Sequence, residues 1–333
     1  MTSERSLLNR IRRAVLSAGE EGAGNVRLGI GDDAAIVRPR RGRELAVSSD
    51  FIIEGVHFLS SYPPKAIGYK ALARGVSDLA AMGAEPLGFL LNLALPRERT
   101  GRWLDGCLRG LEAAARKLRI PLIGGDLATS QEIAICIVVF GDGRANRMVR
   151  RGGARPGDLI YVSGKLGGAR LGLEIIRKRR DRRRDASALL APHYYPQPRL
   201  QLGAWLAEHQ VASAMMDISD GLSIDLGRLC EASHVGAIIE VAQIPIVGIS
   251  EAWRRRLKLA PGASLGYALN GGDDYELLFT VPRRHVPALK QAPNQVPLTC
   301  IGEVTRDRRL RIVDEAGRKL PLKPKGWDHF RSS

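Results

Sequence analysis

The pattern of apolar and polar residues along this chain changes repeatedly between helical and extended periods. Over residues 66–82 apolar side chains recur every three or four positions, which predicts a helix that Gly83 and Pro86 end. Residues 87–95 and 133–140 are almost continuously apolar, which is typical of buried central strands. By the same criteria we expect further helices over 6–18, 101–118, 168–180, 200–209 and 223–232, and further strands over 26–28, 34–37, 44–48, 159–163, 237–241, 277–281 and 299–305.

Helices and strands alternate in both halves of the chain, so the expected fold class is mixed α/β. The stretch 141–158 interrupts this order, because it holds five glycines, one proline and five arginines. A chain of 333 residues suits two domains. We therefore predict one domain over residues 1–146 and a second over residues 147–333.

Composition narrows the class of protein. Apolar residues make up 44% and charged residues 26% of the chain, which is close to ordinary globular usage and excludes a disordered or collagen-like chain. The longest apolar run has eight residues, too few to cross a membrane, and the N-terminal region lacks an uninterrupted apolar segment typical of a secretory signal. The four cysteines lie far apart in sequence, which favours neither zinc sites nor a disulfide framework. We expect a cytoplasmic protein.

The net charge of +16 favours an anionic partner, either a nucleic acid or a phosphorylated small molecule. The densest basic run is Arg177 to Arg184. It is interpreted as the solvated end of a helix, with a nucleic-acid patch as the alternative. Only 5% of the residues are aromatic and none are interleaved with this run, which weighs against single-strand binding.

A series of aspartates that we expect in glycine- or serine-rich turns, next to apolar strands, carries the strongest chemical signal. One such aspartate is ordinarily a turn former or a helix cap. Five such stretches in one chain indicate a shared site, and converging carboxylates would repel each other without cations, for which magnesium with substrate phosphates is the natural choice. The five stretches are Gly31-Asp32-Asp33, Ser48-Ser49-Asp50, Ser77-Asp78, Gly124-Gly125-Asp126 and Asp217-Ile218-Ser219-Asp220-Gly221.

Three familiar nucleotide-binding motifs do not account for an ATP site in this chain. The segment 29–34 fits G-x-G-x-x-A, but a strand is expected after it and two carboxylates would face the pyrophosphate. Lys165 lacks the other residues of a phosphate-binding P-loop, and the protein-kinase signatures are missing from the sequence. Any ATP site is therefore of another type. The roles of His57 and Trp327 stay open on spacing alone, since either side chain could contact a ligand or serve the structure.

Taken together, seven motifs in order resemble the thiamine-monophosphate kinase family. They are GIGDDAAIV (29–37), VSSDFIIEGVHF (47–58), YKALARGVSDLAAMGAEP (69–86), IGGDLATS (123–130), MDISDGLSIDLGRL (216–229), GGDDYELLFTV (271–281) and KGWDHF (325–330). The resemblance implies a two-domain PurM-like synthetase fold, in which the N-terminal domain dimerises through a β-barrel-like interface and builds the ATP site, and an α/β C-terminal domain closes over it. It also implies ATP-dependent phosphorylation of thiamine monophosphate to thiamine diphosphate by direct in-line transfer, the last step of thiamine diphosphate biosynthesis, in a homodimer.

The same resemblance implies roles for single residues. Several Mg²⁺ ions would be held by Asp33, Ser48, Ser49, Asp50, Asp78, Asp126, Asp217 and Asp220. ATP would contact Gly125, Asp126, Arg151 and Ser219, and the substrate would contact His57, Asp273 and Trp327. The catalytic residues would be Asp78, Asp126 and Asp220. Asp273 stands where the family commonly has glutamate, and Ser49 where it often has threonine. Within the superfamily, aminoimidazole ribonucleotide synthetase and selenophosphate synthetase are the alternatives; a nucleic-acid-binding protein is disfavoured because acidic turns would repel a phosphate backbone.

Overall fold

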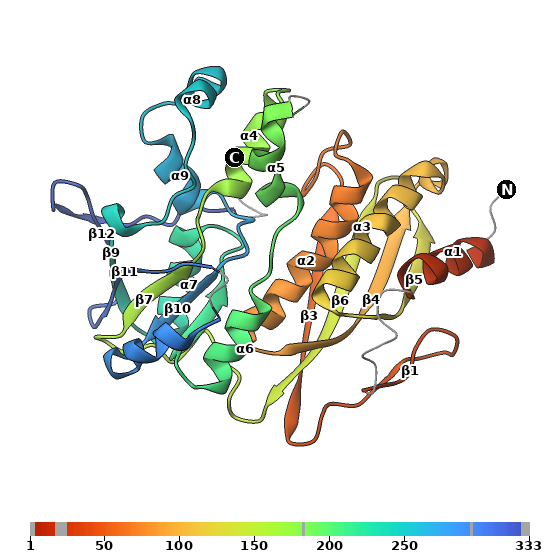
Figure 1. The fold of residues 1–333 in the computed structure, drawn as a ribbon, viewed down its shortest axis with the longest axis horizontal. Helices are drawn as coiled ribbons and strands as arrows, with labels where there is room; N and C mark the ends of the chain where they lie inside the picture. The colour runs from red at the N-terminus through yellow and green to blue at the C-terminus, as the bar shows by residue number, and fades with distance from the viewer. Residues whose placement is uncertain (1–3, 17–24, 182–183, 294–295, 328–333) are drawn as a thin grey trace. The chain divides into compact units, whose positions relative to one another are not determined.

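The computed structural model describes residues 4–16, 25–181, 184–293 and 296–327. The chain divides into two compact units, Met1–Leu79 with Ala84–Asn146, and Ala80–Gly83 with Arg147–Ser333 (Figure 1). Unit 1 contains α1 (Glu4–Leu16), β1 (Val26–Leu28), β2 (Ile36–Val37), β3 (Arg43–Ile53), most of α2 (Pro64–Met82), β4 (Glu85–Leu95), α3 (Arg102–Leu118), β5 (Leu122–Thr129) and β6 (Ala134–Arg144). Unit 2 contains β7 (Leu159–Ser163), α4 (Gly168–Arg177), α5 (Ser187–Tyr194), α6 (Leu200–Glu208), β8 (Ala214–Asp217), α7 (Leu222–Ser233), β9 (Gly236–Glu240), α8 (Glu251–Leu257), α9 (Ala263–Asn270), β10 (Leu277–Val281), β11 (Leu298–Thr305), β12 (Leu310–Val313) and β13 (Lys319–Pro321).

Unit 1 is built on a four-stranded sheet in the order β3-β6-β4-β5. The β4–β5 pair is parallel, and the other pairs are antiparallel. Helices α2 and α3 cover one face of this sheet (Figure 1). Glycines let the two helices approach closely, because a Cβ at Gly68 or Gly110 would overlap the backbone of the facing helix. Alternate residues of β6, such as Ile135 and Ile137, are fully buried beneath α2 and α3.

The opposite face of this sheet carries apolar side chains as well, although strand alternation ordinarily places polar residues on a solvent face. On the edge strand β3, Val47 is 55% exposed and Phe51 is 56% exposed. Their register partners on β6, Phe140 and Cys136, are only half-buried. Apolar faces of this kind are typical of interaction surfaces.

Unit 2 has a seven-stranded sheet in the order β13-β12-β9-β11-β7-β10-β8, antiparallel except for the β12–β9 pair. Its two faces bury separate hydrophobic clusters. One cluster includes Leu222, Leu226 and Leu229 of α7. The other includes Leu202 and Leu206 of α6. Unit 2 is therefore three layers deep, with the sheet between helices.

The mixed α/β class expected from the sequence is confirmed, and most expected elements are present. Some local predictions were wrong. Gly124 and Gly125 do not form a turn but lie inside β5, paired with Leu90 and Leu91. Glycine is needed at position 125, because a Cβ there would overlap the backbone of β4. The sequence patterns also missed β8, α5, α8, α9, β12 and β13.

Two aspartates expected in turns lie instead within strands, Asp50 in β3 and Asp126 in β5. Asp78 lies in α2, within the helix expected over residues 66–82. The helix expected over 168–180 ends at Arg177, inside the basic run, and the end of the helix expected over 6–18 lies outside the described residues. Among the described residues, no helix is both long and apolar enough to span a membrane.

Candidate active site

In unit 1 a polar cluster lies where β3 meets α2. Strand alternation points Ser48 and Asp50 toward the helices and Ser49 toward the opposite face. The Ser48 hydroxyl donates a hydrogen bond to Oδ2 of Asp78, and Asp50 lies 3.6 Å from a guanidinium nitrogen of Arg74. Arg74 and Asp78 are four residues apart on α2 and so share one helix face. Three of the expected magnesium ligands are thereby brought together.

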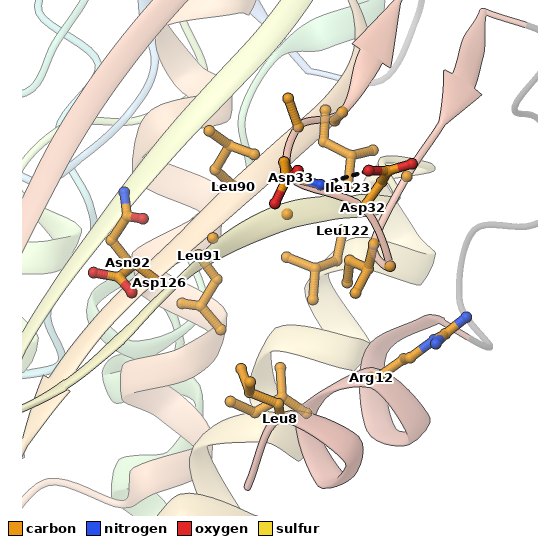
Figure 2. Close-up of a pocket in the computed structure, with 18 of the residues that line it drawn as sticks. Leu8, Arg12, Asp32, Asp33, Leu90, Leu91, Asn92, Leu122, Ile123 and Asp126 are labelled. Carbon is orange, nitrogen blue, oxygen red and sulfur yellow. Dashed lines mark hydrogen bonds between the residues drawn. The ribbon is translucent and has the colours of Figure 1, made fainter. Parts of the chain in front are cut away.

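Asp126 lies on β5, the edge strand opposite β3, and it points to the face of the sheet away from α2 and α3. Its register partner on β4 is Asn92, and that residue pairs with Cys136 of β6, which pairs with Phe51 of β3. These four side chains form one row across the open face of the sheet. Asp126 and its neighbour Gly125 are exposed. Asp126 and Asn92 point the same way in Figure 2.

A cavity of about 830 Å³ lies in unit 1 between this face, the loop before β2 and helix α1. Asp32, Asp33 and Asp126 provide carboxylates to its lining, and Arg12 of α1 provides a cation (Figure 2). Its remaining walls are mostly apolar and glycine-rich. A cavity of this size with few polar groups suits part of a small-molecule ligand.

His57 lies in the turn after β3. Its Nδ1 accepts a hydrogen bond from the backbone N–H of Ile53 at 3.1 Å, and its own backbone N–H donates to the Ile53 carbonyl at 2.8 Å. Since Nδ1 is an acceptor, the neutral ring carries its proton on Nε2. The structure therefore ties the imidazole to the end of β3 and leaves Nε2 as the donor.

In unit 2 three sequence motifs that lie far apart in the chain meet at the loop between β8 and α7. The Ser219 carbonyl accepts the backbone N–H of Asp273 at 2.7 Å, and the Asp220 carbonyl accepts that of Trp327 at 3.0 Å. Gly326 is needed for this approach, because a Cβ there would overlap the Asp220 carbonyl. The expected substrate contacts Asp273 and Trp327 thus lie beside the expected ligands of ATP and magnesium. The Trp327 side chain is 47% exposed, so its ring is accessible.

The carboxylates around this loop have unequal environments. Asp217 is buried at the end of β8, whereas Asp220 is half-buried and forms an ion pair with Arg228 of α7. Behind the loop, Asp225 is completely buried. Burial, reinforced by the negative charge of Asp220, raises the pKa of Asp225 to about 6, although backbone hydrogen bonds and Arg228 act in the opposite direction.

The segment 272–276 is held in place by residues to which the sequence patterns assigned no role. The Tyr275 hydroxyl donates to Asp273 at 2.8 Å. Asp274 accepts backbone N–H groups at the start of α4, at 2.7 and 3.2 Å, and burial raises its pKa to about 7. Glu276 accepts from Ser163 and forms an ion pair with Arg199. Tyr275 and Glu276 stand within a motif that the sequence displays, but only the fold shows what they contact.

Arg151 lies away from this loop within unit 2. Its carbonyl accepts the hydroxyl of Ser233, the last residue of α7, whereas Asp220 precedes the first residue of that helix. Twelve residues of helix span about 18 Å. Unit 2 therefore does not bring the backbone of Arg151 to Ser219, its expected companion in ATP binding.

The donor chemistry of both clusters fits magnesium, since carboxylates and hydroxyls are the hard oxygen ligands it prefers. Across the described part of the chain, however, no three His, Cys, Asp or Glu side chains come close enough to hold a metal ion. A magnesium ion here needs further oxygen ligands, such as substrate phosphates or water.

Comparison with protein families defines the class of this protein. Residues 31–145 match the N-terminal domain of AIR synthase related proteins, and residues 155–315 match their C-terminal domain. The thiamine-monophosphate kinase of Escherichia coli (strain K12) is 39% identical over 310 residues, which cover 92% of this chain and 93% of the relative.

Solved structures agree with this comparison. The thiamine-monophosphate kinase from Stenotrophomonas maltophilia K279a superposes with a TM-score of 0.81 at 34% identity, over 93% of this chain and 96% of the other. AaThiL, solved in complex with AMPPCP and TMP, gives a TM-score of 0.77 at 31% identity, over 98% of this chain and 97% of the other. The chain belongs to the thiamine-monophosphate kinase family.

Proposed function

We propose that this protein transfers the γ-phosphoryl group of ATP to thiamine monophosphate, which gives thiamine diphosphate and ADP as the last step of thiamine diphosphate biosynthesis. The observation that carries this proposal is the meeting of three family motifs at the β8–α7 loop, where Ser219, Asp220, Asp273 and Trp327 lie together. The similarity over 98% of the chain to a kinase solved with an ATP analogue and TMP supports it.

The chemistry fits direct transfer. A phosphate monoester has a second pKa of about 6, so the acceptor is already anionic at neutral pH and needs no strong general base. The difficulty is charge repulsion between two polyanions, and catalysis then consists mainly of positioning and electrostatic stabilisation. A covalent cysteine route is disfavoured at Cys107 and Cys230, because burial raises the pKa of each thiol to about 12. A phosphorylated enzyme intermediate would contradict direct transfer.

We assign the binding of several magnesium ions to the carboxylates and hydroxyls of both units. Asp33, Ser48, Ser49, Asp50, Asp78 and Asp126 would supply oxygen ligands from unit 1, and Asp217 and Asp220 would supply them from unit 2. Bound magnesium would neutralise the phosphate oxygens. Of these residues, Asp78, Asp126 and Asp220 are the proposed catalytic carboxylates.

The remaining roles complete the proposed site. ATP would contact Gly125, Asp126, Arg151 and Ser219, and thiamine monophosphate would contact His57, Asp273 and Trp327. The aromatic face of Trp327 suits the cationic thiazolium ring of the substrate. Residues 1–146 would be the domain for ATP, magnesium and dimerisation, and residues 147–333 the second domain. Four free cysteines fit a reducing cytoplasm.

We further propose a homodimer whose interface is the open apolar face of the four-stranded sheet in unit 1. This face carries Val47 and Phe51 on an edge strand, where a second copy could extend the sheet toward a barrel. Asp50 and Asp126 lie on opposite edges of the sheet, so a site that uses both is more readily completed by two copies than by one.

The test is an assay of ADP release with ATP and magnesium, in which thiamine monophosphate, thiamine and the substrate of aminoimidazole ribonucleotide synthetase are compared. Turnover with thiamine monophosphate alone is expected. Turnover with either other substrate, or with none from folded magnesium-loaded protein, would contradict the proposal.

A further inference from the structure

The backbone of the β8–α7 loop is held from its inner side by one buried side chain. Three consecutive N–H groups, those of residues 219–221, donate to the same oxygen of Asp225, at 3.1, 3.0 and 3.1 Å. The other oxygen of Asp225 accepts from Arg228 at 3.0 Å. Asp225 has no exposed surface, so solvent cannot replace these bonds.

The carbonyl groups of the same loop are bound by the segments that carry the proposed substrate contacts. The Ile218 carbonyl accepts from the N–H of Tyr275 at 2.9 Å, and the next two carbonyls accept from Asp273 and Trp327. The N–H of Ile218 donates to the backbone carbonyl of Glu276 at 2.8 Å. Asp225 therefore holds the N–H groups of this loop, while the carbonyl groups of the loop position the segments that contain Asp273 and Trp327.

Consecutive N–H groups that converge at a strand–helix junction form a favourable site for a phosphate group. In this loop the carboxylate of Asp225 already occupies that position. These N–H groups are therefore not available to a ligand, which can contact the loop through its side chains. The polar side chains of the loop are those of Ser219 and Asp220. A carboxylate and a hydroxyl suit the cation side of a nucleotide complex.

We propose that Asp225 is a positioning residue for the kinase reaction: its carboxylate takes the place of a phosphate in the loop and thereby fixes Ser219 and Asp220 beside Asp273 and Trp327. Arg228 assists, because it bridges Asp225 and Asp220. Its side chain is 42% exposed, so it can release Asp220 to a cation while it keeps its bond to Asp225. This role rests on the proposed function, but its structural part is measurable without turnover.

The experiment compares Asp225→Asn with Asp158→Asn. Asp158 is a matched control, because it is also buried in unit 2 and accepts a backbone N–H, that of Arg155 at 2.9 Å, and a hydroxyl, that of Ser213 at 2.6 Å. Hydrogen–deuterium exchange is measured by mass spectrometry on peptides that cover residues 216–226, together with the melting temperature and the kinetic constants.

In Asp225→Asn, exchange at residues 219–221 should rise at least about tenfold, because charge-assisted hydrogen bonds are weakened. The kcat should fall about ten- to a hundredfold. Asp158→Asn should leave both the loop exchange and kcat within about twofold of the wild type, even at a matched loss of melting temperature. Equal loop exchange in the two variants would overturn the proposal.

The wild-type protein provides a measurement that does not depend on a variant folding. Exchange at residues 219–221 should be slow before any nucleotide is added, and inorganic phosphate should not slow it further, since Asp225 already accepts these hydrogen bonds. Fast exchange that phosphate or AMPPCP suppresses would overturn the assignment. A wild-type protein with a protected loop but no turnover of thiamine monophosphate would instead contradict the proposed function alone.

Discussion

Asp50 and Asp126 lie on opposite edge strands of one four-stranded sheet and point to opposite faces of it. Asp50 pairs with Ile137 beneath the helices, whereas Asp126 belongs to the row on the open face that includes Cys136. Three strand spacings separate them, which amounts to about 14 Å. Two carboxylates at that separation in one sheet cannot share a single magnesium ion, whose ligand distances are about 2 Å.

Together with the homodimer proposed above, this relationship predicts complementation between inactive subunits. Asp50→Asn and Asp126→Asn homodimers should each lose about a hundredfold or more in kcat. A heterodimer with one subunit of each kind, purified through two different tags, should recover about half of the wild-type activity, because one of its two sites then has both carboxylates.

The control for complementation is a heterodimer of the wild type with the double variant Asp50→Asn/Asp126→Asn. A composite site predicts that this pairing is inactive, because each site lacks one carboxylate. If each site belonged to a single chain, the two heterodimers would show the reverse pattern.

Trp327 should act on the substrate rather than on ATP. Trp327→Ala removes an exposed ring whose backbone is tied to the Asp220 loop. Loss of a cation–π contact of about 0.5–2 kcal/mol should raise KM for thiamine monophosphate about two- to thirtyfold, with KM for ATP unchanged. Steady-state kinetics with each substrate varied in turn measures this. Trp327→Phe, which keeps an aromatic face, should recover most of the affinity; equal effects on both KM values would assign Trp327 a structural role.

Gly326 should tolerate no side chain. Gly326→Ala places a Cβ against the Asp220 carbonyl, and the tail must then move away from the loop. The expected result is a raised KM for thiamine monophosphate that resembles the Trp327→Ala effect. The matched control is Gly266→Ala in helix α9, where nothing lies within 4 Å of the added Cβ and a helix should gain about 0.5–1 kcal/mol in stability. Similar kinetics in both variants would contradict the close approach.

The ion pairs of Asp142 with Arg40 and Arg43 should make the free energy of unfolding depend on pH in the acid range. Burial by itself would raise the pKa of Asp142, but hydrogen bonds from Arg40 and the charges of Arg40 and Arg43 outweigh it and hold that pKa below its usual value of 3.8. The stabilisation is therefore complete above the unfolded-state pKa, and it is lost as the pH falls through the lower folded-state pKa. Asp142→Asn should lower the free energy of unfolding by about 2–4 kcal/mol at pH 7.

Urea denaturation at pH 7 and at pH 3 measures this difference. The deficit of Asp142→Asn relative to the wild type should shrink at the lower pH, where the wild-type carboxylate also begins to be protonated. A deficit of the same size at both pH values would mean that the variant acts through packing rather than through charge.

The mixed α/β class, most helices and strands, and the family motifs that single out the aspartates can all be read from the amino-acid sequence. These are local properties, since side-chain periodicity and turn residues act over a few positions. Which of those residues lie together depends on how distant parts of the chain pack, and it became visible only in the folded structure. Strand pairing extended β3 past Ser48 to Ile53, put Asp126 on the far edge from Asp50, and made Gly124-Gly125 part of a strand rather than a turn. The same holds for Asp225, because its burial and the three backbone N–H groups that donate to its carboxylate can be seen only in the folded chain.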